Sequence, residues 1–207
     1  MPAWIPGSYM IRDYARNVVS IRAESDGLDV PLTKLDKSRW RAAPAHKPLT
    51  LIAEIHAYDL SVRGAHLDTT HAYFNGPCVF FAVCGQEDLP CEVEIVPPAG
   101  NAASEWRVAT SMRRKDALPY AFGTFGADDY AELIDHPVEA GHLSIGEFEV
   151  NGIPHAIAIR GKTRVDMGRL CHDLQTLCER HMSLLGVPAV SYTHLTLPTI
   201  QQWCSSR

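Results

Sequence analysis

Apolar and polar residues alternate with a period of two along much of the chain before residue 160. Between residues 49 and 57, the side chains of Leu49, Leu51, Ala53, Ile55 and Ala57 fall on one side. Successive side chains of a strand point to opposite faces, so this alternation predicts a strand with one buried face. Similar patterns predict strands over residues 91–96 and 105–110.

A continuous apolar run covers residues 78–84. It lies between Asn75-Gly76-Pro77 and Gly85, which are turn-forming residues. A short apolar run bounded in this way is typical of a strand that is covered on both faces. We therefore expect residues 78–84 to form a central strand.

The clearest hairpin signal is Asn151-Gly152, which separates residues 147–150 from residues 153–159. Asn and Gly tolerate positive φ at both central positions, which favours a tight type I′ turn. Pro154 cannot donate a ladder hydrogen bond, so we expect the returning strand at a sheet edge or at a bulge. Many short strands separated by turns predict an antiparallel, sandwich-like β-domain.

Helical periodicity occurs in two segments. Residues 128–134 begin with acidic residues, as helix N-termini do, and end before Pro137. Residues 166–185 form a longer helix with Asp166 as its N-cap and Gly186 after its end. Its apolar residues recur at helical spacing and predict one buried stripe, formed by Met167, Leu170, Cys171, Leu174, Leu177, Cys178 and Leu185.

Composition excludes several classes of protein. Among the 207 residues, 46% are hydrophobic and 21% are charged, which excludes a disordered, collagen-like or coiled-coil chain. The formal net charge of −5 indicates that nucleic acid is not a partner. The sequence contains no apolar stretch long enough for a membrane helix, and the first residues do not resemble a signal peptide. The six cysteines lack metal-binding or scaffold spacing, so we expect free thiols.

The ten histidines suggest no metal site by their spacing. The H-E-x-x-H motif, which places two imidazoles one helical turn apart, is absent. His66 and His71 are five residues apart, and His172 and His181 are nine apart, so neither pair shares one face of a helix. The sequence therefore predicts no metal ligand and no catalytic residue in this chain. Phosphate-binding glycine motifs are also absent.

An acidic cluster surrounds Pro137. Such a group of carboxylates can take part in acid–base chemistry or bind an ammonium group. The alternative is a solvated helix start followed by a turn, and spacing alone favours this alternative. The members of the cluster are Asp128, Asp129, Glu132, Asp135 and Glu139.

Residues 2–18, P-A-W-I-P-G-S-Y-M-I-R-D-Y-A-R-N-V, resemble the N-terminal signature of the glycyl aminopeptidase family. These enzymes are zinc metallopeptidases that also carry a PDZ domain. Further blocks resemble the family in the same order, and the resemblance covers residues 2–188. The blocks are residues 35–40, 58–63, 74–76, 106–110 and 129–139. Agreement of several ordered blocks is more specific than any single short motif.

The resemblance implies an N-terminal β-domain followed by a thermolysin-like catalytic domain. We accordingly predict a β-domain over residues 1–160 and the truncated start of the catalytic domain, including its first helix, over residues 161–189. In the family, two histidines and a glutamate hold zinc, and a second glutamate activates water. The zinc-binding motif is absent here, so we expect the parent enzyme to bind zinc and this chain alone to bind none and to be inactive.

The resemblance also implies a substrate and two candidate residues. The parent would remove N-terminal residues from peptides, with glycine or alanine as candidates. The missing catalytic domain would bind these peptides. An exopeptidase needs negative charge near the substrate's amino group, and Asp135 and Glu139 are the predicted substrate-binding carboxylates. The oligomeric state is left open.

Residues 190–199, V-S-Y-T-H-L-T-L-P-T, resemble a sequencing adapter that has been translated by accident. We therefore expect residues 190–207 to be non-native and to form no part of the native fold. The alternative is a native strand. The N-terminus is also expected to be cut, because the family has a strand before the W-I-P-G-S-Y block, and the compartment is therefore left open between cytoplasm and periplasm.

A second hypothesis needs no missing domain. The chain would be a stand-alone β-sandwich module for ligand binding or protein interaction. Its ligand platform would consist of the aromatic residues Trp4, Tyr9, Tyr73 and Phe74. Core packing is the commoner use of such rings.

Overall fold

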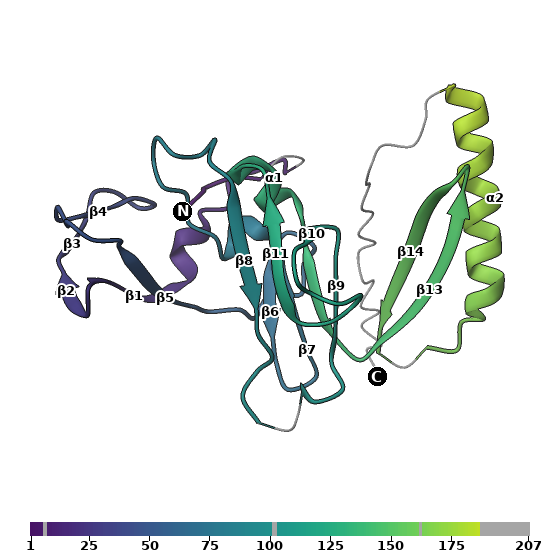
Figure 1. Cartoon of the computed structure of the whole chain (residues 1–207), viewed down its shortest axis with the longest axis horizontal. Helices are drawn as coiled ribbons and strands as arrows, with labels where there is room; N and C mark the ends of the chain where they lie inside the picture. Colours follow the sequence, from purple (N-terminus) through teal and green to yellow (C-terminus); the bar gives the residue numbers. More distant parts are fainter. Residues whose placement is uncertain (6–7, 101–102, 162, 187–207) are drawn as a thin grey trace, which may run out of the picture.

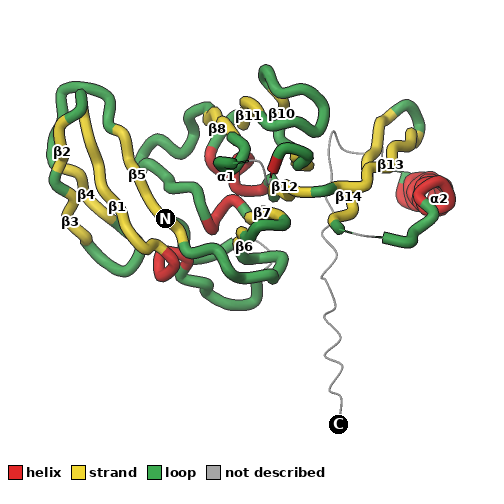
Figure 2. The backbone as a smooth tube through the Cα atoms, turned by 90° about the horizontal axis from the view of Figure 1, so that it is seen from below, coloured by secondary structure: helices red, strands yellow, loops and turns green. Residues whose placement is uncertain are grey.

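The computed structural model describes residues 1–5, 8–100, 103–161 and 163–186. Across these residues the fold is mainly antiparallel β structure with a long helix at the C-terminal end, as predicted. Figures 1 and 2 show three parts in a row: an N-terminal sheet, a central sandwich, and a hairpin with its helix. Residues Pro6 and Gly7 of the family signature and the tail over residues 190–207 lie outside the described residues.

The N-terminal part is a three-stranded sheet beside a two-stranded ribbon. The sheet has the order β2-β1-β5, and the ribbon pairs β3 with β4. The prediction of a strand over residues 49–57 is confirmed by β5, although Leu51 on the predicted inner face remains 39% exposed. The elements are η1 (Tyr14–Asn17), β1 (Val18–Ser25), β2 (Leu28–Val30), β3 (Leu32–Lys34), β4 (Trp40–Ala42) and β5 (Thr50–Ile55).

The central part consists of two sheets that pack face to face. One sheet has the order β6-β7-β12-β9, and the other has the order β10-β11-β8. The main hydrophobic core lies between them and includes Val108, Phe125 and Val138. The strands are β6 (Ala65–Leu67), β7 (His71–Phe74), β8 (Cys91–Ile95), β9 (Arg107–Thr110), β10 (Arg113–Arg114), β11 (Gly123–Ala127) and β12 (Val138–Gly141). The predicted strands over residues 91–96 and 105–110 are therefore confirmed.

The third part is the hairpin of β13 (Leu143–Val150) and β14 (Ile153–Arg160) with α2 (Met167–Leu185) packed against it. Asn151 and Gly152 both have positive φ, 51° and 80°, as the predicted tight turn requires. The Asp166 side chain accepts a hydrogen bond from the amide of Arg169, which confirms the predicted N-cap. Because this sheet has two strands, Pro154 lies on an edge strand, as predicted.

The prediction of a central strand over residues 78–84 is wrong. After the short 3-10 helix η2 (Gly76–Cys78), this segment runs as an irregular loop. The side chains of this loop are apolar because the loop passes from one hydrophobic cluster to another and contributes to both. Cys78 and Val79 pack in the cluster around Ile5 and Tyr14, whereas Phe80 packs against the sandwich core.

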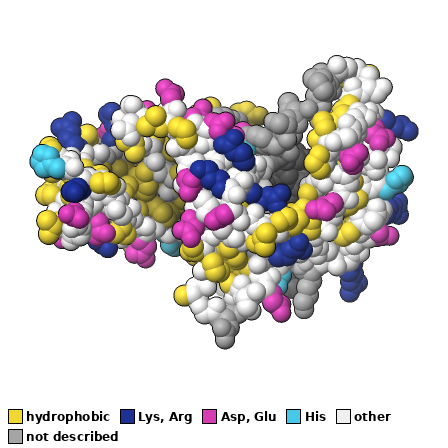
Figure 3. Space-filling view, in the orientation of Figure 1, with side chains coloured by type: hydrophobic (Ala, Val, Ile, Leu, Met, Phe, Trp, Pro, Cys, Tyr) yellow, Lys and Arg dark blue, Asp and Glu magenta, His cyan; other side chains and the backbone are white. Residues whose placement is uncertain are grey.

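The helix α1 (Tyr130–Asp135) precedes β12 and confirms the predicted helix over residues 128–134. Asp129 caps it by accepting a hydrogen bond from the amide of Glu132 at 2.7 Å. Figure 3 shows acidic and basic side chains interspersed over one face of the molecule. Among the described residues, no helix is both long enough and apolar enough to cross a membrane.

Candidate functional site

The four-stranded sheet has one apolar and one polar face. Val138 and Ala140 of β12 point into the core, so Glu139 between them points to the opposite face. Glu139 pairs with Tyr73 of β7, and Tyr73 pairs with His66 of β6. One row of this polar face therefore carries an imidazole, a phenol and a carboxylate from three adjacent strands.

Glu139 lies half-buried on this face. Its Oε1 atom is 3.4 Å from Nε of Arg160, which is the last residue of β14. Burial raises the pKa of Glu139 to about 7, and the charge of Arg160 partly opposes that rise. A carboxylate with such a pKa changes its charge near neutral pH, which is a property of groups that bind or transfer protons.

Tyr73 is held in place beside Glu139. Its hydroxyl donates a hydrogen bond to the carbonyl oxygen of Val62 at 2.8 Å. Burial raises the pKa of Tyr73 to about 12, so this side chain is a neutral hydrogen-bonding group. The fixed Tyr73 side chain is the cross-strand neighbour of Glu139.

Asp135, the other predicted substrate-binding residue, lies in a different environment. It is the last residue of α1 and is exposed, whereas Glu139 is half-buried on β12. Between them His136 is 1% exposed, and its Nδ1 lies 2.7 Å from the hydroxyl oxygen of Ser111. The anchored His136 separates the exposed end of α1 from the strand that carries Glu139.

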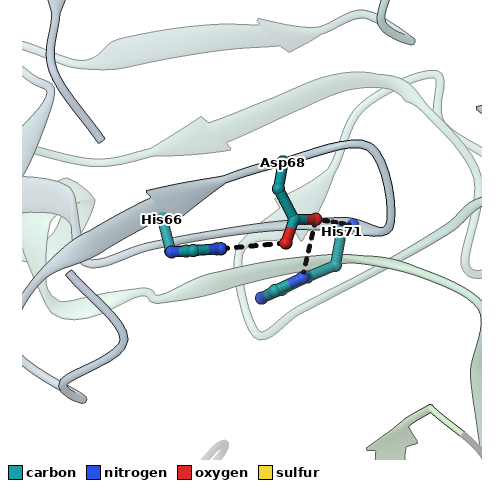
Figure 4. A group of neighbouring side chains, drawn as sticks. All are labelled: His66, Asp68 and His71. Atoms are coloured by element: carbon teal, nitrogen blue, oxygen red, sulfur yellow. Dashed lines mark hydrogen bonds and ion pairs between the residues drawn. The ribbon is translucent and has the colours of Figure 1, made fainter. Parts of the chain in front are cut away.

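The hairpin of β6 and β7 brings together residues that spacing did not connect. His66 lies on β6, His71 begins β7, and Asp68 lies in the turn between them (Figure 4). The two imidazole rings are stacked with their centroids 4.7 Å apart. The donor atoms of all three residues lie within 4.8 Å of one another, so this group of described residues could hold a metal ion.

Asp68 organises this turn. Hydrogen bonds, chiefly from the hydroxyl and the amide of Thr70, lower the pKa of Asp68. The pKa of His71 is also lowered, by burial and then by the charge of Arg160, which favours the neutral ring. Helical spacing does not connect His66 with His71, but Asp68 before Thr69-Thr70-His71 is a recognisable turn signal that brings the two strands together.

A cavity of about 650 Å³ opens between the edge of this sheet and the hairpin of β13 and β14. It is lined by both polar and charged side chains, including Arg107 and Arg160. The other lining residues are Thr70, Glu105, His142, Leu143, Ser144 and Gly161. Arg160 thus contacts Glu139 and also borders the cavity.

The aromatic platform of the second hypothesis is not formed. Tyr73 and Phe74 are neighbours on β7, so they point to opposite faces of the sheet. Phe74 packs against Phe80 in the interior, with ring centroids 5.8 Å apart. Tyr9 is fully exposed. These rings therefore do not share one surface.

A solved structure has the same fold. It is the crystal structure of an aminopeptidase N family protein from Idiomarina loihiensis, and it matches 90% of this chain with a TM-score of 0.87 and 42% sequence identity. The chain covers 31% of that protein, which is less than a third of its length. The fold is therefore that of a peptidase N-terminal domain.

The family follows from a second comparison. The family model described as Peptidase M61 N-terminal domain matches residues 1–142. The chain belongs to this family. No curated protein sequence matches the chain.

Proposed function

We propose that the chain is the N-terminal, non-catalytic portion of a zinc-dependent aminopeptidase of the glycyl aminopeptidase type, with a PDZ domain further along the parent. The parent removes N-terminal residues, glycine or alanine, from peptides. The observation that carries this proposal is the 42% identity, over 90% of the chain, to an aminopeptidase N family protein. The ordered blocks of sequence that resemble the family support it.

The chain supplies a scaffold rather than the metal site of the reaction. Its sequence contains no H-E-x-x-H motif, and His172 and His181 on α2 are nine residues apart, which does not fit the catalytic zinc set. No step of the reaction is therefore assigned to a metal held by these residues. The division into a β-domain over residues 1–160 and a catalytic domain from residue 161 remains part of the proposal.

Packing supports a close connection between the scaffold and α2. A Cβ atom added to Gly146 of β13 would lie 2.5 Å from Sγ of Cys171 on α2. The helix therefore approaches the hairpin where the strand has no side chain. This close contact fixes the orientation of α2 on the hairpin. In this way the β-domain would hold the first helix of the catalytic domain in place.

Glu139 and Asp135 are the proposed carboxylates near the amino group of the substrate. Glu139 is the stronger candidate, because it is half-buried and contacts Arg160, which lines a cavity, whereas Asp135 lies at an exposed helix end. A charge-assisted hydrogen bond from an ammonium to a carboxylate is about twice as strong as a neutral one. The substrate would compete with Arg160 for Glu139.

The test compares two proteins. The 207-residue chain and the longer polypeptide encoded by the source gene are each assayed with amino-acid anilides. We expect no turnover by the chain, and turnover by the longer protein that a chelator abolishes and zinc restores. A longer protein without aminopeptidase activity, or a reading frame that contains no H-E-x-x-H, would refute the proposal.

A second experiment tests the two carboxylates in the longer protein. Glu139→Gln should lower kcat/KM at least tenfold for substrates with a free amino group, because a charged partner is lost. Asp135→Asn should have a smaller effect. An exposed strand residue, Glu94, provides the matched control Glu94→Gln, which should leave kcat/KM unchanged. Unchanged kinetics for Glu139→Gln would remove that assignment.

A further inference from the structure

The hairpin of β6 and β7 holds three metal-binding side chains in a small volume. His66 and His71 lie on paired strands, and Asp68 lies in the turn that connects these strands. The amide of Asp68 donates a hydrogen bond to the carbonyl oxygen of His71 at 3.0 Å, which closes the turn. The backbone therefore fixes the positions from which all three side chains start.

Two imidazoles and a carboxylate are a donor set that suits Zn²⁺. Nε2 of His66 lies 3.2 Å from Oδ2 of Asp68, and Nδ1 of His71 lies 3.3 Å from Oδ1. Bonds of about 2.0–2.1 Å to a tetrahedral zinc ion place ligand atoms about 3.3 Å apart. Each ring therefore already lies at ligand spacing from one oxygen of the carboxylate, His66 from Oδ2 and His71 from Oδ1. An ion bound through Oδ2 would draw His71 toward that oxygen, within a group whose donor atoms lie within 4.8 Å of one another.

The two oxygens of Asp68 have different partners. Oδ1 accepts hydrogen bonds from the amide and the hydroxyl of Thr70 and from the amide of His71. Oδ2 contacts Nε2 of His66. Oδ2 can therefore bind a cation while Oδ1 continues to hold the turn.

Burial and access also suit a metal ion. The side chains of His66 and His71 are 6% and 4% exposed, whereas that of Asp68 is 37% exposed. The imidazoles are thus preorganised, and an ion can enter from the side of the carboxylate. Figure 4 shows both rings on the same side of the Asp68 carboxylate. Arg160 is the nearby positive charge, and Glu139 offsets it at 3.4 Å.

In contrast to the expectation from the sequence that this chain binds no zinc, we propose that His66, Asp68 and His71 bind one divalent transition-metal ion, with Zn²⁺ as the best-fitting ion. The alternative role of Asp68 is a hydrogen-bonded clamp for the two rings. We expect a dissociation constant in the micromolar range. Nδ1 of His66 has no hydrogen-bond partner among the described residues, and the absence of such an outer hydrogen bond lowers metal affinity about 10- to 100-fold.

The test is titration of the purified full chain with Zn²⁺ at neutral pH by calorimetry, and with Co²⁺ by visible absorption. We expect one ion per chain and the strong visible bands of four-coordinate cobalt, without a thiolate charge-transfer band. His66→Gln and His71→Gln should each weaken binding at least tenfold. The exposed His46 provides the control His46→Gln, which should bind as the wild type does.

A second measurement follows the histidine side chains themselves by nuclear magnetic resonance. In the wild-type chain, Zn²⁺ should shift the side-chain nitrogen resonances of two histidines, which Asp68→Asn should abolish while the amide side chain still holds the turn. Absence of binding would overturn the proposal. Binding that persists in both His66→Gln and His71→Gln, or that shifts only other histidines, would overturn it as well.

Discussion

The carboxylate of Glu139 lies 3.4 Å from the guanidinium of Arg160 and thereby joins β12 of the central sandwich to β14 of the hairpin. The two residues are far apart in sequence and come from different sheets. Their contact places a titratable group where the two parts of the molecule meet, so its protonation is coupled to how these parts hold together.

Glu139→Gln should flatten the pH dependence of stability. Burial raises the pKa of Glu139 from its ordinary value of 4.5 to about 7. The folded chain therefore holds this proton more tightly than the unfolded chain. The wild type should lose about 2 to 3 kcal/mol of unfolding free energy as the pH rises from 4.5 to 7, with no further loss from this group above that range.

Urea denaturation at a series of pH values measures this slope. Glu139→Gln should lack the loss between pH 4.5 and pH 7, whereas Glu94→Gln on the exposed side of β8 should retain it. If the profile of Glu139→Gln runs parallel to that of the wild type, the carboxylate does not titrate as inferred.

Gly146→Ala should loosen the packing of α2 on the hairpin. The added Cβ would lie 2.5 Å from Sγ of Cys171 and 3.0 Å from Cε of Met167. Overpacking of this kind costs about 1–3 kcal/mol. Gly168→Ala is the matched control, because its Cβ meets no atom closer than 3.4 Å, and it should be neutral or stabilising by up to about 1 kcal/mol. Denaturation followed by helical circular dichroism compares the two, and equal stabilities would contradict the contact.

Asp68→Ala should destabilise the β6–β7 hairpin. Removal of the carboxylate leaves the amides of Thr70 and His71 without the acceptor that holds the turn. We expect a loss of about 1–3 kcal/mol in the absence of metal. Asp68→Asn retains an oxygen acceptor and should lose less. Asp88→Asn, at an exposed loop residue, is the control in thermal denaturation, and a loss as large as that of Asp68→Ala would show a general charge effect.

The chain should self-associate through α2. Leu177 and Leu185 of the predicted apolar stripe are 50% and 69% exposed, and the neighbouring Leu184 is 81% exposed. Exposed apolar surface of this kind favours association. Sedimentation velocity at increasing concentration should show oligomers for the wild type and monomers for the double variant Leu177→Gln/Leu184→Gln. Arg180→Gln on the same helix should associate as the wild type does.

Local elements could be predicted because their causes lie within a few residues. The turn at Asn151-Gly152 needs positive φ at both positions, and these two residue types supply it. The same holds for α2, where Asp166 caps the first turn and Gly186 ends the helix with φ 64°. Period-two alternation likewise located β5, β8 and β9.

The irregular loop over residues 78–84 could not be predicted from local patterns of this kind. An apolar run indicates that its side chains are buried, but it does not indicate which parts of the structure cover them. Here one loop places Cys78 in one cluster and Phe80 in another, so an apolar run arises without strand pairing. Only the positions of both clusters distinguish this loop from a central strand.

The mainly β class, the hairpin, the long helix and the candidate Glu139 all follow from the order of residues along the chain. The surroundings of these residues depend on the folded arrangement. It placed Arg160 beside Glu139 and stacked His66 on His71 across a turn. The physical reason is range: capping, turns and alternation act between near neighbours, whereas burial and charge pairing depend on strands that meet only after the chain has folded.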